Sequence, residues 1–151
     1  MRIWIDGDGC PVVNIAIKMA KAVGLPVTVV KNYAVEVKDP YATVVTVDIS
    51  RDAADFYIVN HMAKGDIVIS QDYGLAAMVL SKNGICINQN GRQITRDNID
   101  LILDQRHHSR VERTKNKKYT KFKKRSEEDN QHFMDAFAQV LQRVSRSTSN
   151  I

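Results

Sequence analysis

Short apolar stretches alternate with longer amphipathic stretches over most of the chain. The short stretches are rich in valine and isoleucine and are bounded by glycine, proline or polar residues, a pattern typical of buried strands. The predicted strands are residues 2–6, 27–31, 43–48, 67–70 and 85–88. The predicted helices are residues 11–23, 51–63, 74–82 and 98–107, and Gly24 and Gly84 stop the first and the third of them.

This alternation predicts an α/β fold. Short apolar strands joined by helices form a mostly parallel sheet with right-handed connections, and helices cover both of its faces. We therefore expect residues 1–109 to form a three-layer, Rossmann-like domain around a mostly parallel five-stranded sheet. Ligands of such sheets bind beyond the carboxyl ends of the strands, near the point where the strand order reverses. Functional side chains are expected at that edge.

The rest of the chain divides into a basic loop, residues 110–125, and a C-terminal helix. Apolar residues recur at helical spacing between Glu127 and Val144, so this helix is amphipathic and is expected to dock on the α/β domain. We predict one domain, in which residues 126–151 supply the docking helix and a disordered end. The apolar positions are Phe133, Met134, Phe137, Val140, Leu141 and Val144.

Composition excludes several classes of protein. A chain of 151 residues with 44% hydrophobic residues suffices for one domain with its own core. The chain reaches Asp6 after a very short apolar stretch, and no apolar run approaches the roughly 20 residues that cross a bilayer. We expect a cytoplasmic protein with no membrane partner. Cys10 and Cys86 lack the spacing of a zinc site or a disulfide framework, so both are predicted to be free thiols.

The net charge of +5 hides an asymmetry along the chain. Residues 1–104 carry 10 lysines and arginines against 12 acids, whereas residues 105–151 carry 12 against 5. The excess lies between Arg106 and Arg125, with Tyr119 and Phe122 among the basic residues. Such a segment favours a polyanion whose phosphates it binds and whose bases it stacks, and the alternative is a merely solubilising loop. The candidate contacts are Arg110, Arg113, Lys117, Lys118, Tyr119, Lys121, Lys123 and Lys124.

Several acids follow predicted strands at one edge of the sheet. Asp6 ends the first strand, Asp8 follows it, Asp48 ends the third strand, and Asp72 follows the fourth. At the same edge, Asp52 and Asp55 begin a helix and share one helical face because they are three residues apart. Asp66 precedes the fourth strand and is excluded, because roughly 20 Å of strand separates it from Asp72.

Carboxylates that converge in this way repel one another unless a proton or a cation neutralises them. Mg²⁺ and Mn²⁺ prefer oxygen ligands, so the acids predict a divalent-metal site with Asp6, Asp52, Asp55 and Asp72 as candidate ligands. Each acid also has a plain structural interpretation: a turn for Asp8 and Asp48, a favourable first-turn charge for Asp52, and a solvated position for Asp55. Asp6 and Asp72 directly follow strands and have no evident cap to make.

Three further residues near this edge have less specific signals. Ser70 and Gln71 are candidates for holding water or phosphate, or they simply end the strand. Cys10 precedes Pro11 at a helix start, but position 16 is Ala16 rather than the arginine of a phosphatase loop. A packed small residue is therefore favoured over an activated thiol at this position.

Five segments together resemble the YaiI/YqxD family of uncharacterised bacterial proteins. They read DGDGCPV, RDAADFYIV, GDIVISQDYGLAAMVL, NQNGRQIT and NID, and the resemblance covers about residues 1–145. Gly7 and Gly9 stand where alanines are usual in that family, Gly74 where a proline is usual, and Ile94 where a tyrosine is common. None of these departures removes an acid.

The resemblance carries an implication for function. The YaiI/YqxD family looks like a branch of the PIN-like and NYN nuclease folds, in which acids follow the first and fourth strands. It thereby implies a Mg²⁺- or Mn²⁺-dependent nuclease, with RNA as the favoured substrate and with Asp6, Asp8, Asp52 or Asp55, and Asp72 as catalytic residues. PIN-like sites often carry a second acid just after the fourth-strand aspartate, where this chain has Tyr73 and Gly74. One metal or two is therefore left open.

Two other functions remain as alternatives. The first is a non-catalytic RNA-binding module on the same fold, in which the acids bind metal only to shape the site. The second is a haloacid-dehalogenase-like phosphatase, because a strand that runs into Asp6-Gly7-Asp8 resembles the nucleophile loop of that class. That class needs a later acid at the carboxyl end of a strand, whereas Asp66 precedes its strand, so the predicted topology opposes it.

Overall fold

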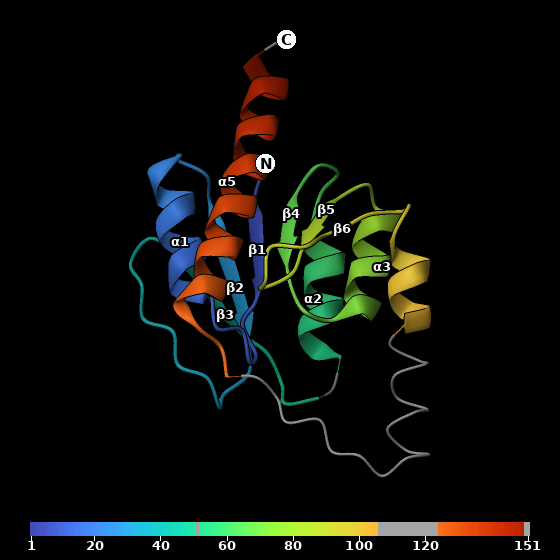
Figure 1. The fold of residues 1–151 in the computed structure, drawn as a ribbon. Coiled ribbons are helices and arrows are strands. Elements are labelled where there is room, and N and C mark those ends of the chain that lie inside the picture. The colour runs from blue at the N-terminus through green and yellow to red at the C-terminus, as the bar shows by residue number, and fades with distance from the viewer. Residues whose placement is uncertain (51, 106–123, 150–151) are drawn as a thin grey trace.

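The computed structural model describes residues 1–50, 52–105 and 124–149 (Figure 1). One sheet contains six strands in the order β3-β2-β1-β4-β5-β6, and only β6 is antiparallel to its neighbour. The strands are β1 (Ile3–Asp6), β2 (Val27–Lys31), β3 (Thr43–Thr46), β4 (Ile67–Ile69), β5 (Ile85–Ile87) and β6 (Gln93–Ile94). The predicted α/β fold with a mostly parallel sheet is confirmed. The expected number of five strands is wrong, because β6 has two residues, too few to show an alternating pattern.

The helices lie where the amphipathic stretches predict them, with shifted ends. They are α1 (Val13–Ala22), α2 (Ala53–His61), α3 (Tyr73–Ser81) and α5 (Glu127–Ser149), and residues 99–105 are also helical. The helix α1 begins two residues later than expected, at Val13. The helix α5 continues five residues past Val144, where the apolar pattern ends.

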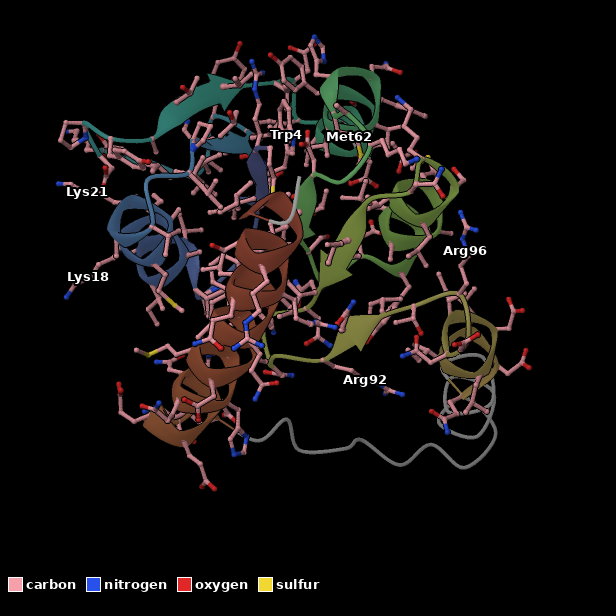
Figure 2. All side chains as sticks on the ribbon, turned by 90° about the horizontal axis from the view of Figure 1, so that it is seen from above. Trp4, Lys18, Lys21, Met62, Arg92 and Arg96 are labelled. Atoms are coloured by element: carbon pink, nitrogen blue, oxygen red, sulfur yellow. The ribbon has the colours of Figure 1, made fainter. Side chains whose placement is uncertain are left out.

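The sheet separates two hydrophobic cores, so the expected three layers are present. One core joins α1 and α5 to one face of the sheet through side chains such as Ile5, Ile17 and Phe133. The other joins α2, α3 and helical residues 99–105 to the opposite face, with Trp4 and Met62 among its buried residues (Figure 2). In Figure 1, α1 and α5 lie on one side of the sheet, and α2 and α3 lie on the other.

The helix α5 packs closely on the rest of the fold. Phe133 and Phe137 are fully buried, with ring centroids 5.4 Å apart. Met134 was expected on the same packed face, but it is 37% exposed and lies outside it. Gly91, in the turn between β5 and β6, has a φ of +88°, and a Cβ there would lie 2.7 Å from the carbonyl oxygen of His132. Only glycine fits this approach between the turn and the helix.

Two observations concern the cysteines and the helices. Cys10 and Cys86 are both free. Among the described helices, none is both long and apolar enough to cross a membrane.

The strand order reverses between β1 and β4. The chain adds β2 and β3 on one side of β1 and then returns to place β4 on its other side. The connections that leave β1 and β4 therefore diverge to opposite faces of the sheet, which opens a crevice at the carboxyl ends of these two strands. Asp6 ends β1 and Asp72 follows β4, so the fold itself places both acids at this crevice.

Candidate functional site

An open cleft of about 840 Å³ occupies the predicted edge of the sheet. Four carboxylates line it, from Asp6, Asp8, Asp55 and Asp72. Asp48 and Asp52, which were also predicted for this edge, are exposed and do not line the cleft. The remaining lining residues are Ser50, Ala54, Gln71, Tyr73, Asn88, Gln89 and Asn90. We refer to this space as the acidic cleft.

Asp6 is fixed by a short relay of hydrogen bonds. The hydroxyl of Ser70, a buried residue at the end of β4, donates to Asp6 Oδ2 at 3.0 Å. The backbone N–H of Asp72 donates to the Ser70 oxygen, also at 3.0 Å. Burial raises the pKa of Asp6, and the charges of Asp8 and Asp72 raise it further, while the bond from Ser70 opposes the shift. Ser70 therefore orients Asp6 and is not itself part of the cleft lining.

Asp72 is the N-cap of α3, so the expectation that it has no evident cap to make is wrong. Its Oδ1 accepts from the N–H of Gly74 at 2.8 Å and from the N–H of Leu75 at 3.2 Å. The cap uses Oδ1 only, so Asp72 combines a structural role with a place in the cleft.

Asp55 is buried in the cleft wall, and its predicted alternative as a solvated helix residue is wrong. Only 7% of the residue is exposed. Burial raises the pKa of Asp55 to about 7, with further contributions from the charges of Asp72 and Asp6, a hydrogen bond shared with Asp72, and the charge of Asp52. Without a cation, the cleft therefore retains a proton on Asp55 up to about neutral pH.

Asp8 holds the loop after β1 against the end of β2. Its Oδ1 accepts from the backbone N–H of Asn32 at 2.8 Å. The preceding residue, Gly7, donates its N–H to the carbonyl of Val30, and a Cβ at this glycine would lie 2.9 Å from a methyl group of Val29. Asp8 thus has a partly structural role, in line with its interpretation as a turn residue.

Cys10 and Asp66 have the roles that the sequence favoured. Burial raises the pKa of the Cys10 thiol, which is the opposite of activation, and the residue packs against the core below α1. Asp66 lies at the amino end of β4, where its carboxylate accepts from Arg2 N, Trp4 Nε1 and Ala63 N at 2.9–3.0 Å. Asp66 therefore lies away from the acidic cleft, as expected.

Most of the predicted nucleic-acid contacts lie outside the described residues. Those are Arg110, Arg113, Lys117, Lys118, Tyr119, Lys121 and Lys123. Lys124 is described and exposed. The next residue, Arg125, ends the basic segment and reaches the border of the cleft: it donates to Asn90 Oδ1 at 2.9 Å and to the carbonyl of Gln89 at 2.8 Å.

Sequence reasoning missed the part of the cleft lining that follows β5. It consists of three consecutive amide side chains, Asn88, Gln89 and Asn90, which follow β5 and which we call the amide wall. The rule that placed Asp6 and Asp72 also applies to the carboxyl end of β5 and could have identified these residues. The contact between this wall and Arg125 had no local signal, because 35 residues separate Asn90 from Arg125.

The donor set fits a divalent cation that keeps part of its water shell. Carboxylate and amide oxygens dominate the cleft, and neither lysine nor arginine is among its described lining residues. Across the described part of the chain, no three His, Cys, Asp or Glu side chains already stand in a metal-binding arrangement. Mg²⁺ needs no such cage, because it commonly binds one or two carboxylates and fills its remaining positions with water and phosphate.

Comparison with known proteins gives the family. The family model for the uncharacterised YaiI/YqxD proteins matches residues 4–143. A UPF0178 protein from Alkaliphilus oremlandii is 51% identical over 133 residues, which cover 88% of this chain and 86% of the relative. A UPF0178 protein from Natranaerobius thermophilus is 40% identical over 147 residues, which cover 97% of this chain and all of the relative. Among solved structures, a mutant of Rae1 (YacP) from Bacillus subtilis is similar at a TM-score of 0.44 and 16% identity, over 58% of this chain and 70% of that one. With its family model matched over nearly the whole length, the chain belongs to the YaiI/YqxD family.

Proposed function

We propose that this protein is a Mg²⁺- or Mn²⁺-dependent nuclease that hydrolyses phosphodiester bonds in RNA. One observation carries the proposal: four carboxylates from separate parts of the chain converge on one cleft at the point where the strand order reverses. Burial and mutual repulsion raise the pKa values of two of them, Asp6 and Asp55. Such an arrangement costs stability, and it is typical of functional sites.

Asp6, Asp55 and Asp72 are the candidate ligands, of which one or two would contact the cation directly while water completes its shell. When bound, a divalent cation supplies Lewis acidity that activates water and stabilises negative charge on a phosphate. Ser70 keeps Asp6 oriented, and the cap of α3 keeps Asp72 in place, so both ligands are ordered before substrate arrives. Asp52 contributes charge from outside the cleft, since it is close enough to raise the pKa of Asp55.

A proton acceptor is also available in the cleft. Asp8 lines the cleft, and its Oδ1 is anchored by the N–H of Asn32. A carboxylate held in this way is suited to accept a proton from the attacking water, which is general base catalysis. Asp55 releases its own proton more readily once a cation neutralises its neighbours, because their repulsion contributes to its raised pKa.

The charge distribution supports a nucleic acid as the substrate. The segment from Arg106 to Arg125 carries ten lysines and arginines and one acid, Glu112. Its last residue, Arg125, is tied to the amide wall, and no carboxylate of the described residues lies within 4.0 Å of its guanidinium. The basic segment therefore ends beside the cleft, where it would bind the phosphates on either side of the bond to be cut.

The test is a nuclease assay on a fluorescent single-stranded RNA with Asp72→Asn as the variant. Asparagine caps helices as well as aspartate, so this change removes the charge and keeps α3 intact. The matched control is Asp100→Asn, an exposed acid outside the cleft. We expect Mn²⁺-dependent cleavage in the wild type and the control, with a loss of roughly 100-fold or more in Asp72→Asn, on the order of the effect of one transition-state contact. Equal cleavage by all three proteins would refute the proposal.

A second function is favoured by the capping role of Asp72, which gives this carboxylate a structural task that needs no metal. It is a non-catalytic RNA-binding module on the same fold. In that case, the wild type and Asp72→Asn would bind RNA equally well, and neither would cleave it in Mg²⁺ or Mn²⁺. The same assay with a parallel binding measurement separates the two functions.

A further inference from the structure

The amide wall lies one strand away from the segment that carries Asp72. Ile69 of β4 pairs with Ile87 of β5, and the N–H of Ser70 donates to the carbonyl of Ile87 at 3.1 Å. Gln71 and Asp72 follow β4, Gln89 follows β5, and all three residues line the acidic cleft. A group bound at Asp72 thus shares one cleft with the amide wall.

The wall is held in a fixed conformation by its own side chains and by Arg125. Asn88 Oδ1 accepts from the N–H groups of Asn90 and Arg92, which closes the turn between β5 and β6. Arg125 donates to Asn90 Oδ1 and to the carbonyl of Gln89, while its Nε donates to Asn130 of α5. Arg125 therefore joins the wall to the start of α5.

One side-chain oxygen of the amide wall lacks a hydrogen-bond donor. The oxygens of Asn88 and Asn90 both accept hydrogen bonds within the protein. Gln89 Oε1 is buried and, among the described residues, is the side-chain atom of this kind without a hydrogen-bond partner. A buried acceptor without a donor is unfavourable, and a ligand donor that reaches Gln89 from the cleft, which this residue lines, would satisfy it.

The hydrogen-bonding capacity of the groups in the cleft and in a nucleic acid limits which group can be that donor. The phosphates of a nucleic acid only accept hydrogen bonds, and no carboxyl group of the cleft donates to Gln89 Oε1 in the structure. The sugar is the part of a nucleotide next to the phosphate, and ribose carries a 2′-hydroxyl that deoxyribose lacks. We propose that Gln89 accepts a hydrogen bond from a ribose 2′-hydroxyl and thereby selects RNA over DNA in the acidic cleft. This inference rests on the proposed nuclease function.

Two substitutions at Gln89 separate the acceptor from the shape of the side chain. Gln89→Met keeps the length of the side chain and removes the acceptor, whereas Gln89→Glu keeps an acceptor oxygen. The matched control is Gln142→Met, on the exposed side of α5 and outside the acidic cleft. All are made in the Asp72→Asn background, so that binding to RNA and DNA strands of equal sequence is measured in Mg²⁺ by fluorescence anisotropy, with cleavage monitored in parallel.

We expect Gln89→Met to lower the ratio of RNA affinity to DNA affinity by roughly threefold to tenfold, the value of one hydrogen bond. Gln89→Glu should keep the ratio, although its added charge weakens binding of both strands, and Gln142→Met should change nothing. An unchanged ratio in Gln89→Met overturns the inference while the nuclease proposal stands. A change in base preference at a constant ratio also overturns it, because the donor would then be a base. If the parent protein binds neither strand, the nuclease proposal fails as well.

Discussion

Replacing Asp55 with asparagine should stabilise the protein in the absence of metal, and the gain should depend on pH. The pKa of Asp55 is raised from 3.8 to about 7 in the folded state, so the folded state binds its proton more tightly than the unfolded state does. The stability of the wild type therefore falls as pH rises from about 4 to about 7 and changes little above that range. Asparagine carries no ionisable proton and removes this dependence.

The size of the effect follows from the pKa shift. Each pKa unit corresponds to about 1.36 kcal/mol, so the part of the shift that lies between pH 5 and pH 7 is worth about 2.5 kcal/mol. The advantage of Asp55→Asn over the wild type should grow by about this amount between pH 5 and pH 8. In a domain of this size, the difference between the two melting temperatures should grow by roughly 5–10 °C.

The measurement is urea unfolding of both proteins at pH 5, 6, 7 and 8 in EDTA. The two proteins are compared by how much the difference between their free energies of unfolding grows with pH. This comparison cancels any constant effect of the substitution on packing. Asp100→Asn is the control, since Asp100 is exposed and outside the cleft. Saturating Mg²⁺ should then stabilise the wild type and leave Asp55→Asn nearly unchanged, because only ligand bound to the native state adds stability. A difference that stays constant with pH would refute the raised pKa and with it the account of repulsion in the cleft.

Three further predictions concern Asp66, Gly91 and the basic segment. Asp66→Asn should destabilise the protein by roughly 1–3 kcal/mol, because its amide cannot accept all three buried bonds, yet the Mg²⁺-induced rise in melting temperature should survive. Gly91→Ala should cost about 1–3 kcal/mol in urea unfolding, since its methyl group would meet the backbone of α5, and unchanged stability would contradict the close packing described. Replacing five lysines of the basic segment with serine should weaken RNA binding. The slope of log affinity against log salt concentration should flatten by roughly 0.7 for each phosphate contact that is lost. An unaltered slope in filter binding would show that the segment has no role in RNA binding. Those lysines are Lys117, Lys118, Lys121, Lys123 and Lys124.

The sequence alone determined the class of fold and the edge of the sheet where the site lies. Strand and helix periodicities are local properties, so the apolar stretches identified the first five strands and most helices within a few residues. Parallel strands share a carboxyl edge, and for that reason Asp6 and Asp72 could be placed together from their positions relative to the apolar stretches. The same argument separated Asp66 from them.

Only the tertiary structure decided what each side chain at that edge does. Asp52 and Asp55 share a helical face in the sequence pattern, but the packing of α2 against the sheet buries Asp55 and leaves Asp52 exposed. The pKa of Asp55 depends on Asp6 and Asp72, which approach it through folding and not through neighbourhood in the chain. The amide wall acquires its unpaired oxygen and its bond to Arg125 in the same way. Burial and long-range hydrogen bonds are sums over distant residues, so no local pattern in the sequence contains them.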